Sequence, residues 1–260
     1  MKWLLRAFEG AGYTAFLLGR AARFWFRKPR MAATAKLMYD SGLKSLPVVA
    51  IVAFFSGMIL CLQTGLAVAR YGETEVLGLV VAQTFAREFG PFMTCLLLGG
   101  TVVSAYAAEI GTMTVSEETD ALRVMSIDPV GYLAAPRVLS LTVMALLLTL
   151  CADLVGMLGG SVVASAQLGL PYGIFWDRAL ESLEGGGRFG LPRDLYGGLL
   201  KAALMGYVIA GIGCAQGLRA GGGALGVGRC VRRAVISSIV MILVISYNFS
   251  WLIYRAFGDS

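Results

Sequence analysis

Residues 46–69 read LPVVAIVAFFSGMILCLQTGLAVA, a run that contains no charged side chain. At about 1.5 Å per residue, a helix of this length crosses the hydrocarbon core of a bilayer, which is about 30 Å thick. Further apolar runs follow at about 91–108, 138–166, 195–217 and 234–254. The sequence therefore predicts an all-α integral membrane protein with about five transmembrane helices.

The composition of the 260 residues agrees with this fold class. Hydrophobic residues make up 57% of the chain and charged residues 15%, whereas soluble domains have about 45–50% and about 25%. The net charge is +6, and the basic residues lie beside the apolar runs and not in a separate basic domain. Their distribution therefore indicates membrane topology and no nucleic-acid partner.

Two residue types limit the possible chemistry. Histidine is absent, which excludes histidine general bases and Ser/His/Asp nucleophile systems. The cysteines have no CxxC spacing and stand among apolar residues, so we expect buried core residues and no metal site at Cys61, Cys95, Cys151, Cys214 and Cys230.

The segment 1–44 carries nine basic residues against two acids, which places it in the cytoplasm by the positive-inside rule. No uninterrupted apolar core precedes a small-residue cleavage site, so we do not expect a cleaved signal peptide. Arginines 20, 23 and 27 share one helical face, and the opposite face collects Ala15, Leu18, Ala22, Trp25 and Phe26. This pattern predicts an amphipathic helix in the headgroup region, ended by Pro29, or an ordinary juxtamembrane anchor.

The connections between spans also follow the charge rule. A short polar turn with Arg70, Glu73 and Glu75 joins the first two spans into a hairpin, and residues 167–194 form a mixed-charge outer loop. A basic turn rich in glycine precedes the last span and is predicted to be a flexible inner loop, Ala220–Gly228; it lacks the Lys-Ser/Thr of a phosphate-binding loop. The run 138–166 exceeds the bilayer thickness and must tilt, kink or protrude.

The polar insert 109–129, EIGTMTVSEETDALRVMSIDP, lies on the cytoplasmic side between spans two and three. Thr114 and Glu117 have capping-box spacing, and Asp128-Pro129 stops the helix, so a short amphipathic helix is predicted over about 114–127. It cannot cross the membrane. Its apolar side, which includes Leu122 and Met125, must rest on this protein, on the bilayer surface or in the groove of a soluble partner.

Ionisable residues at membrane depth are costly and are therefore candidates for function. Arg87 and Glu88 open the second span and are expected to form a local ion pair. Asp153 lies within the third span and is expected to bond polar groups of a neighbouring helix. Uncharged polar residues in the first and fifth spans favour either an amphiphile cavity or interhelical hydrogen bonds, namely Gln63, Thr64, Tyr247, Asn248 and Ser250. Small-residue pairs, Gly156 with Gly160 and Gly213 with Gly217, allow close helix contact.

Three stretches carry a family resemblance: FFSGMILCLQTG (54–65), AREFGPFMTCLLLGGTVVSAYAAEIGTMTVSEETDALRVMSIDPVGYLAAPRVL (86–139) and GGGALGVGRCVRRAV (221–235). They resemble the MlaE (YrbE-type) family of ABC-transporter permeases over nearly the whole chain from Leu46 onward. The resemblance implies that 45–260 is a transmembrane permease domain in the bacterial inner membrane, with a cytoplasmic N-terminus and no catalytic residue or cofactor of its own.

The same resemblance implies partners and site residues. Two permease copies would form a homodimer that moves phospholipid between the inner membrane and a periplasmic ring of MCE-domain proteins. A dimer of ATPase subunits would bind ATP and Mg, and a STAS-domain regulator accompanies some members. The insert becomes a coupling helix that docks on the ATPase through Glu109, Thr114, Glu117, Glu118, Asp120, Leu122, Arg123 and Met125. Leu62, Gln63 and Leu66, with Tyr247 and Asn248, would line the lipid cavity.

One position departs from the family pattern. Where the family often has an arginine, this chain has Thr101, so a cation is missing from the second span. Two rivals to the transporter remain open: an ion-coupled secondary carrier that uses Asp153 and Glu109, and a membrane scaffold that recruits a soluble protein without transport.

Overall fold

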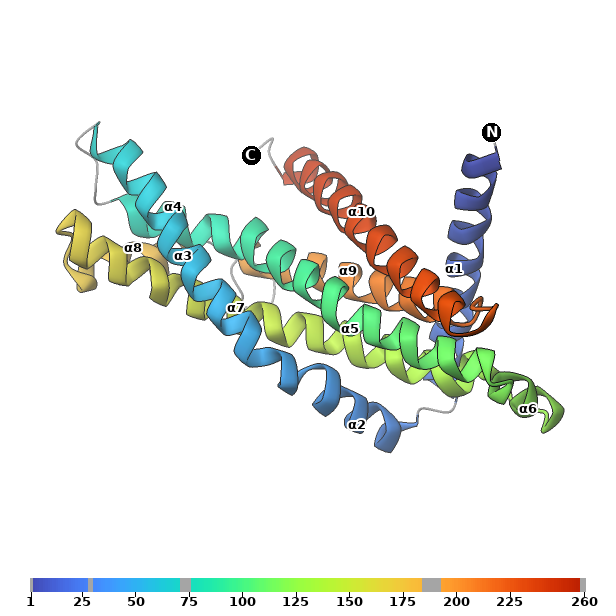
Figure 1. Ribbon diagram of the computed structural model, residues 1–260. Helices are drawn as coiled ribbons and strands as arrows, with labels where there is room; N and C mark the ends of the chain where they lie inside the picture. The colour runs from blue at the N-terminus through green and yellow to red at the C-terminus, as the bar shows by residue number, and fades with distance from the viewer. Residues whose placement is uncertain (1, 28–29, 71–75, 184–192, 258–260) are drawn as a thin grey trace. The chain divides into compact units, whose positions relative to one another are not determined.

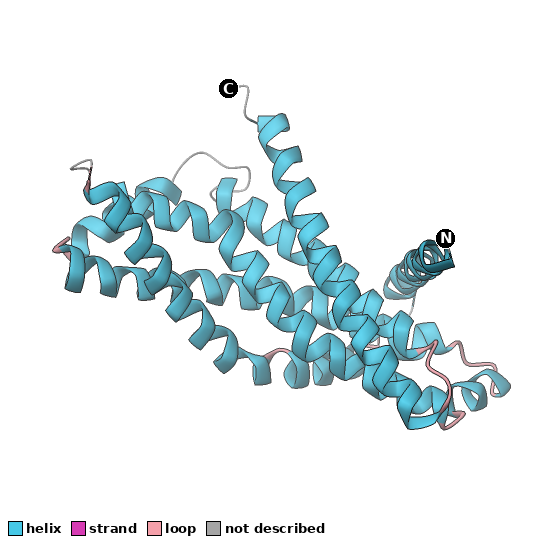
Figure 2. Ribbon diagram, turned by 45° about the horizontal axis from the view of Figure 1, so that its top comes forward, coloured by secondary structure: helices cyan, strands magenta, loops and turns pink. Residues whose placement is uncertain are grey.

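The computed structural model describes residues 2–27, 30–70, 76–183 and 193–257 of the chain. All regular secondary structure in these ranges is helical (Figure 2). The chain divides into two compact units built from interleaved segments. One comprises Met1–Lys44, Cys95–Ala145 and Ala203–Tyr247, and is called unit 1; the other comprises Ser45–Thr94, Leu146–Ala202 and Asn248–Ser260, and is called unit 2.

The helices follow one another along the chain as labelled in Figure 1. In order they are α1 (Lys2–Arg27), α2 (Met31–Ser41), η1 (Leu43–Ser45), α3 (Leu46–Ala69), α4 (Leu77–Thr84), η3 (Phe85–Phe89), α5 (Gly90–Val115), α6 (Glu118–Val124), η4 (Val130–Ala134), α7 (Ala135–Leu168), α8 (Tyr172–Leu183), α9 (Arg193–Gly217) and α10 (Gly223–Phe257). The segments η3 and η4 are π-helical turns that lead directly into α5 and α7.

The five predicted transmembrane helices are confirmed. In the described part of the chain, five helical stretches are long and apolar enough to span a bilayer: Met31–Ala69, Leu77–Val115, Val130–Leu168, Asp194–Gly217 and Gly223–Ile253. Four of them extend well beyond the predicted limits. Helix α2 leads through η1 into α3, the π-helical turns join α4 to α5 and lead into α7, and α10 already begins at Gly223.

Unit 2 contains two helices that the sequence interpretation placed in loops. Residues 77–90 were assigned to no element, yet they form α4 and η3; part of the predicted outer loop 167–194 forms α8. The two helices pack against each other, and α4 also contacts α3 (Figure 1). Burial of their apolar faces stabilises both helices, and the core that results is lined by Cys61, Leu77, Val81, Phe85, Val163 and Phe175. Glu73, Glu75 and residues 184–192 of the predicted loops lie outside the described residues.

Glycines allow the helices of unit 2 to meet at their backbones. A β-carbon at Gly57 of α3 would overlap the carbonyl group of Gly156 in α7, and one at Gly159 would overlap the carbonyl of Phe54. Gly78 of α4 meets the Phe175 carbonyl of α8 in the same way. Close contact through small residues is the usual basis of helix association in lipid, where no hydrophobic effect drives it. The role predicted for Gly156 is thus confirmed.

In unit 1 the amphipathic helix α1 ends at Arg27, as the sequence predicts, and it packs on the protein. Leu17 and Leu18 are buried, whereas Ala15, assigned to the same apolar face, is exposed. The Trp25 indole N–H donates to the Ala135 carbonyl at 2.9 Å. The Tyr207 hydroxyl donates to the Leu18 carbonyl at 2.8 Å, although α1 and α9 are far apart in sequence. The apolar face of α1 therefore covers other helices of unit 1.

The glycine-rich segment before the last span is not the flexible loop that its composition indicates. Helix α10 begins at Gly223, so Ala224–Gly228 are already helical. Gly222 and Gly223 have φ values of 85° and 70°, which a side chain would strain, and they make the turn that starts the helix. Four of the cysteines are buried as predicted, Cys61, Cys95, Cys214 and Cys230, whereas Cys151 is partly accessible; none of the five forms a disulfide in the described part of the chain.

Candidate functional site

The short helix α6 lies between α5 and α7 in unit 1 and presents charged and apolar side chains together. Glu118, Asp120 and Arg123 are exposed, and Arg123 pairs with Asp120 at 2.9 Å. Val124 is 87% exposed and Met125 61%, which is unusual for apolar residues of a polar segment. An exposed apolar end on a charged helix indicates a contact surface that another molecule covers.

The limits and the start of α6 differ from those predicted. Thr114 is still inside α5, where its hydroxyl donates to the Ile110 carbonyl at 2.8 Å, so it caps nothing. Glu117 is the N-cap residue of α6, but it has a left-handed backbone, φ 62°, and forms no capping hydrogen bond through its side chain. Ser126, just after α6, is also left-handed, with φ 60°. The capping-box prediction is wrong, and two left-handed residues define the ends of α6 instead.

Asp128 does not simply stop α6. Its carboxylate accepts hydrogen bonds from the backbone N–H groups of Val130 and Gly131, at the start of η4. It also forms a salt bridge of 3.0 Å with Arg20 of α1. The carboxylate thus satisfies free N–H groups at the first turn and complements the helix dipole there, and it fixes the return of the chain from α6 towards α7.

An ion pair joins the two long helices of unit 1 that flank α6. Arg137 of α7 donates through Nη2 to Glu109 Oε2 of α5 at 2.9 Å and through Nη1 to the Leu133 carbonyl at 3.0 Å. The guanidinium also lies 5.8 Å from the centre of the Tyr106 ring. The sequence analysis selects Glu109 but not Arg137, because its partner lies 28 residues away in the sequence.

A chain of hydroxyl groups continues from this ion pair. The Tyr106 hydroxyl donates to Ser41 Oγ at 3.0 Å, and Ser41 Oγ lies 3.4 Å from Ser140 Oγ. Both Ser41 and Ser140 are buried. Helices α2, α5 and α7 are thus held together by a connected set of polar side chains within unit 1.

Unit 2 contains a second charged group, around Lys201 of α9. The Lys201 ammonium, only 2% exposed, donates to Glu88 Oε2 at 2.5 Å and to Ser250 Oγ at 2.9 Å. Ser250 of α10 in turn donates to the other oxygen of Glu88. Two other helical segments, η3 and α10, therefore supply the partners of one buried cation of α9, and such partners are the usual requirement for a charge at membrane depth.

Arg87 and Glu88 do not form the local ion pair that the sequence interpretation expected. Arg87 Nε pairs with Asp194 Oδ1 at 2.5 Å, while Glu88 pairs with Lys201. The reason is geometric, because neighbouring residues of a helix point in directions about 100° apart and cannot face each other. The two side chains reach separate partners at positions far along the sequence.

Asp153 also differs from its prediction. It is buried in α7, and neither carboxylate oxygen has a hydrogen-bond partner among the described residues. The expected bond to polar groups of a neighbouring helix is absent from that part of the chain.

The residues predicted to line a lipid cavity differ in their exposure to solvent. Leu62 is partly buried and packs on the core of unit 2. The remainder are exposed: Gln63, Leu66, Tyr247 and Asn248. Thr101, which stands where the family often has arginine, is exposed on α5 and donates its hydroxyl to the Leu97 carbonyl at 2.8 Å. Their role in holding lipid stays a prediction.

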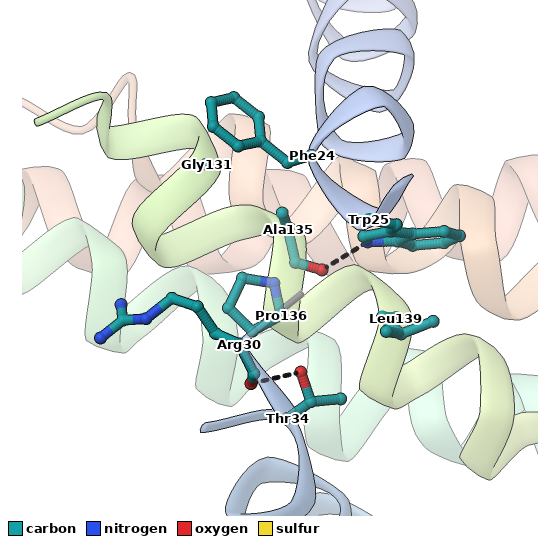
Figure 3. A pocket seen from close by; sticks show the side chains of 8 residues that line it. All are labelled: Phe24, Trp25, Arg30, Thr34, Gly131, Ala135, Pro136 and Leu139. Carbon is teal, nitrogen blue, oxygen red and sulfur yellow. Dashed lines mark hydrogen bonds between the residues drawn. The ribbon is translucent and has the colours of Figure 1, made fainter. Parts of the chain in front are cut away.

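A small cavity lies where α1 and α2 meet the start of α7, within unit 1 (Figure 3). Figure 3 shows the Trp25–Ala135 hydrogen bond on one side and the bond from Thr34 to the Arg30 carbonyl on the other. Its volume of about 10 Å³ holds no more than about one water molecule. The cavity is therefore too small for a lipid headgroup and reflects the packing of α1 on unit 1.

Comparison with known proteins identifies the family. The family model described as Permease MlaE matches residues 34–252, which include α3 to α9 and most of α10. The chain belongs to the MlaE permease family. Membership agrees with the five apolar helices that are long enough to span a membrane.

Relatives of this MlaE permease carry transporter names. A probable ABC transporter permease protein of Rickettsia conorii is 36% identical over 82% of this chain and 80% of its own length. One of Synechocystis sp. is 37% identical, over 87% of this chain and 84% of the relative. The chloroplastic protein TRIGALACTOSYLDIACYLGLYCEROL 1 of Arabidopsis thaliana is 35% identical over 87% of this chain and 63% of the relative.

Proposed function

We propose that this MlaE permease is the membrane subunit of an ATP-driven transporter that moves phospholipid between the inner membrane and a periplasmic MCE-domain protein. In this proposal a second copy of the chain completes the permease, and an ATPase dimer supplies ATP and Mg. A STAS-domain regulator could join the ATPase. No covalent chemistry takes place in this chain.

The observation that carries the proposal is the exposure of α6 with its apolar end uncovered. Val124 and Met125 project beside the acidic residues Glu118 and Asp120. A helix of seven residues is too short to be stable by itself, and its apolar end lowers its free energy if a partner groove covers it. A cytoplasmic ATPase with a basic rim and an apolar groove fits both features.

The proposed motion passes from α6 to the polar contacts beside it. Pressure on α6 acts on Glu109 and Arg137, since these residues join the two helices that α6 connects. Rigid-body displacement of packed helices is a common way to convert a local contact into a change of cavity shape. ATP-driven closure of the ATPase dimer would thereby open or close a path for lipid between two permease copies.

Support for a lipid substrate comes from the family and from the side chains at membrane depth. The Arabidopsis relative is named for trigalactosyldiacylglycerol, a glycerolipid. Apart from Asp153, the ionisable residues named above in unit 2 are arranged in opposite pairs, Glu88 with Lys201 and Arg87 with Asp194. Such pairs can exchange partners with the phosphate and the cation of a zwitterionic headgroup without leaving a net charge.

The test is to purify the chain from its native host in mild detergent, identify the subunits that copurify, and measure ATP hydrolysis and lipid transfer. We expect an ATPase and an MCE-domain protein in fixed ratio, with hydrolysis stimulated by phospholipid. The variant Val124→Asp/Met125→Asp should lose ATPase binding and lipid transfer. Asp177→Lys, an equally exposed change on α8, is the control and should keep both.

Two outcomes would overturn the proposal. Transport that continues without nucleotide and stops when the ion gradient is removed would identify a secondary carrier. Binding of a soluble protein to α6 with no effect on lipid transfer would identify a scaffold.

A further inference from the structure

Asp153 is the most conspicuous polar residue of unit 2 that the proposed function does not use. It is 1% exposed, and both of its carboxylate oxygens lack a hydrogen-bond partner in the described part of the chain. No basic residue described by the structure forms a salt bridge with it. An ionised carboxylate without water, donor or counter-ion is too costly to persist in such an environment.

Two buried threonines of the same unit are also unsatisfied. The hydroxyl oxygens of Thr94 in α5 and Thr149 in α7 have no hydrogen-bond partner within the ranges that the structure describes. Helical threonines of this chain ordinarily donate to the carbonyl four residues earlier, as do Thr14, Thr34, Thr84, Thr101, Thr112, Thr114 and Thr142. Thr94 and Thr149 are turned away from that carbonyl, so their oxygens remain available to something else.

Helix geometry brings these three side chains to one place. A β-carbon at Gly90 would overlap Asp153 Oδ1, so the carboxylate lies directly against the first turn of α5. Thr94 is one turn along α5 from Gly90, and Thr149 is one turn along α7 from Asp153. Residues four apart lie on the same helix face. The threonines therefore belong to the two faces that meet at the Gly90–Asp153 contact.

A backbone oxygen completes the set. The Phe85 carbonyl oxygen would lie 3.2 Å from that same β-carbon of Gly90, on the π-helical turn η3 that leads into α5. Single π-helical turns inside helices occur frequently at functional sites, because they shift the hydrogen-bond register of the backbone. Five oxygens thus lie on the facing sides of α5, with its π-helical lead-in, and of α7, and four of them have no partner among the described residues.

We propose that Asp153, Thr94 and Thr149 form a buried site for one dehydrated alkali-metal cation. One carboxylate and one monovalent cation sum to zero charge, as the low dielectric of the span requires. Hard cations take carboxylate, hydroxyl and carbonyl oxygens as ligands. A divalent ion fits poorly, because no group of three or more His, Cys, Asp or Glu residues that could hold a metal occurs in the described ranges.

This site does not depend on the proposed transport function. Its effect is to join α5 to α7 in unit 2 through a neutral, oxygen-lined contact, at the point where η3 changes the helix register. Removal of the cation leaves the carboxylate uncompensated, so the contact should weaken. The occupancy of the site then depends on the type and concentration of the cation in solution and not on nucleotide.

The test uses the full-length chain, with any subunits that copurify, in lipid nanodiscs. Thermal unfolding is followed with a thiol-reactive dye, which reports the exposure of the buried cysteines. The buffer contains the chloride of sodium, potassium, lithium or N-methyl-D-glucamine at constant ionic strength and constant pH. We expect the Tm to rise to a plateau as one alkali cation is added, and not to rise with N-methyl-D-glucamine.

Variants separate the site from general salt effects. Asp153→Asn should abolish the cation response, and its Tm in N-methyl-D-glucamine should equal or exceed that of the wild type, because a neutral amide needs no counter-ion. Thr149→Val should raise the apparent dissociation constant of the cation about tenfold or more. Thr142→Val, whose hydroxyl already bonds the Val138 carbonyl, and Asp177→Asn should respond as the wild type does.

The proposal is overturned if the wild-type Tm is the same in all four chlorides. It is also overturned if the Tm is indifferent to the cation but rises as the pH is lowered and Asp153→Asn removes that rise, which would identify a protonated carboxyl group in place of a bound metal ion. A cation response that persists in Asp153→Asn would place the binding elsewhere and contradict the assignment.

Discussion

Arg137 and Glu109 form a salt bridge of 2.9 Å in which the burial of the two partners is unequal: the side chain of Arg137 is 9% exposed and that of Glu109 53%. Water can therefore reach the carboxylate but hardly the guanidinium. Because the cost of losing a partner depends on the group left behind, the two halves of this salt bridge should not be equivalent.

Glu109→Ala should destabilise the chain more than Arg137→Met. The first change leaves a buried cation with only the Leu133 carbonyl and the Tyr106 ring, at a cost of about 2–4 kcal/mol; the second leaves a carboxylate that water hydrates, at about 1–2 kcal/mol. Thermal unfolding in detergent measures both. The double variant should be more stable than Glu109→Ala alone, and additive losses would contradict the asymmetry.

Exchanging the charges of Glu88 and Lys201 should restore the yield of folded protein that either single change lowers. Glu88→Lys places two cations together beside Ser250, and Lys201→Glu places two anions together, so each should lower the yield of folded protein severely. The double variant recreates an opposite pair between the same helices. Yield after size-exclusion chromatography is the measurement, and no recovery in the double variant would show that the direction of the pair matters.

Gly57→Ala should separate α3 from α7 in unit 2, because the new methyl group overlaps the Gly156 carbonyl. Overpacking of this kind costs about 1–3 kcal/mol. Gly173→Ala on α8 is the matched control, since nothing lies within 4 Å of its β-carbon, and alanine should favour that helix by up to about 1 kcal/mol. The two changes are expected to move the Tm in opposite directions, and equal shifts would refute the backbone contact.

The left-handed residues at the ends of α6 give a fourth expectation. Glu117→Gly should be tolerated, because glycine relieves a backbone strain of about 1–2 kcal/mol while it increases the freedom of the unfolded chain. Glu117→Val keeps a side chain and adds β-branching at the same φ, so it should displace α6. ATPase pull-down compares the two variants with Ser126→Gly; loss of binding in Glu117→Gly but not in Ser126→Gly would show that the Glu117 carboxylate itself makes the contact.

Much of the fold could be predicted from the sequence because lipid imposes a long apolar run on each span. The five spans follow from that rule, and the end of α1 at Arg27 follows from the helix-breaking Pro29. Helices α4 and α8 were missed because both contain or adjoin charged residues and are stabilised by packing on each other. Both are also too short to span a membrane, at 8 and 12 residues, and a short apolar run gives no clear periodicity.

The site was harder to predict, because its contacts join residues far apart in sequence. Glu88 finds Lys201, and Arg87 finds Asp194, at separations that no local pattern indicates. Thr114 was mispredicted for a different reason. A threonine near a helix end can cap the next helix, or its hydroxyl can donate to a carbonyl one turn earlier in its own helix, as Thr114 does. Only the position of the backbone decides between the two.

The distribution of the thiols makes the chain suitable for site-specific spectroscopic labelling. Four cysteines are enclosed by packed helices, and only Cys151 is partly accessible. A single change, Cys151→Ala, should therefore yield a background almost silent towards maleimide and nitroxide reagents under native conditions. Paired labels placed on α6 and on exposed positions of α8 could then report distances through the transport cycle by pulsed electron spin resonance, without removal of the cysteines that fill the core.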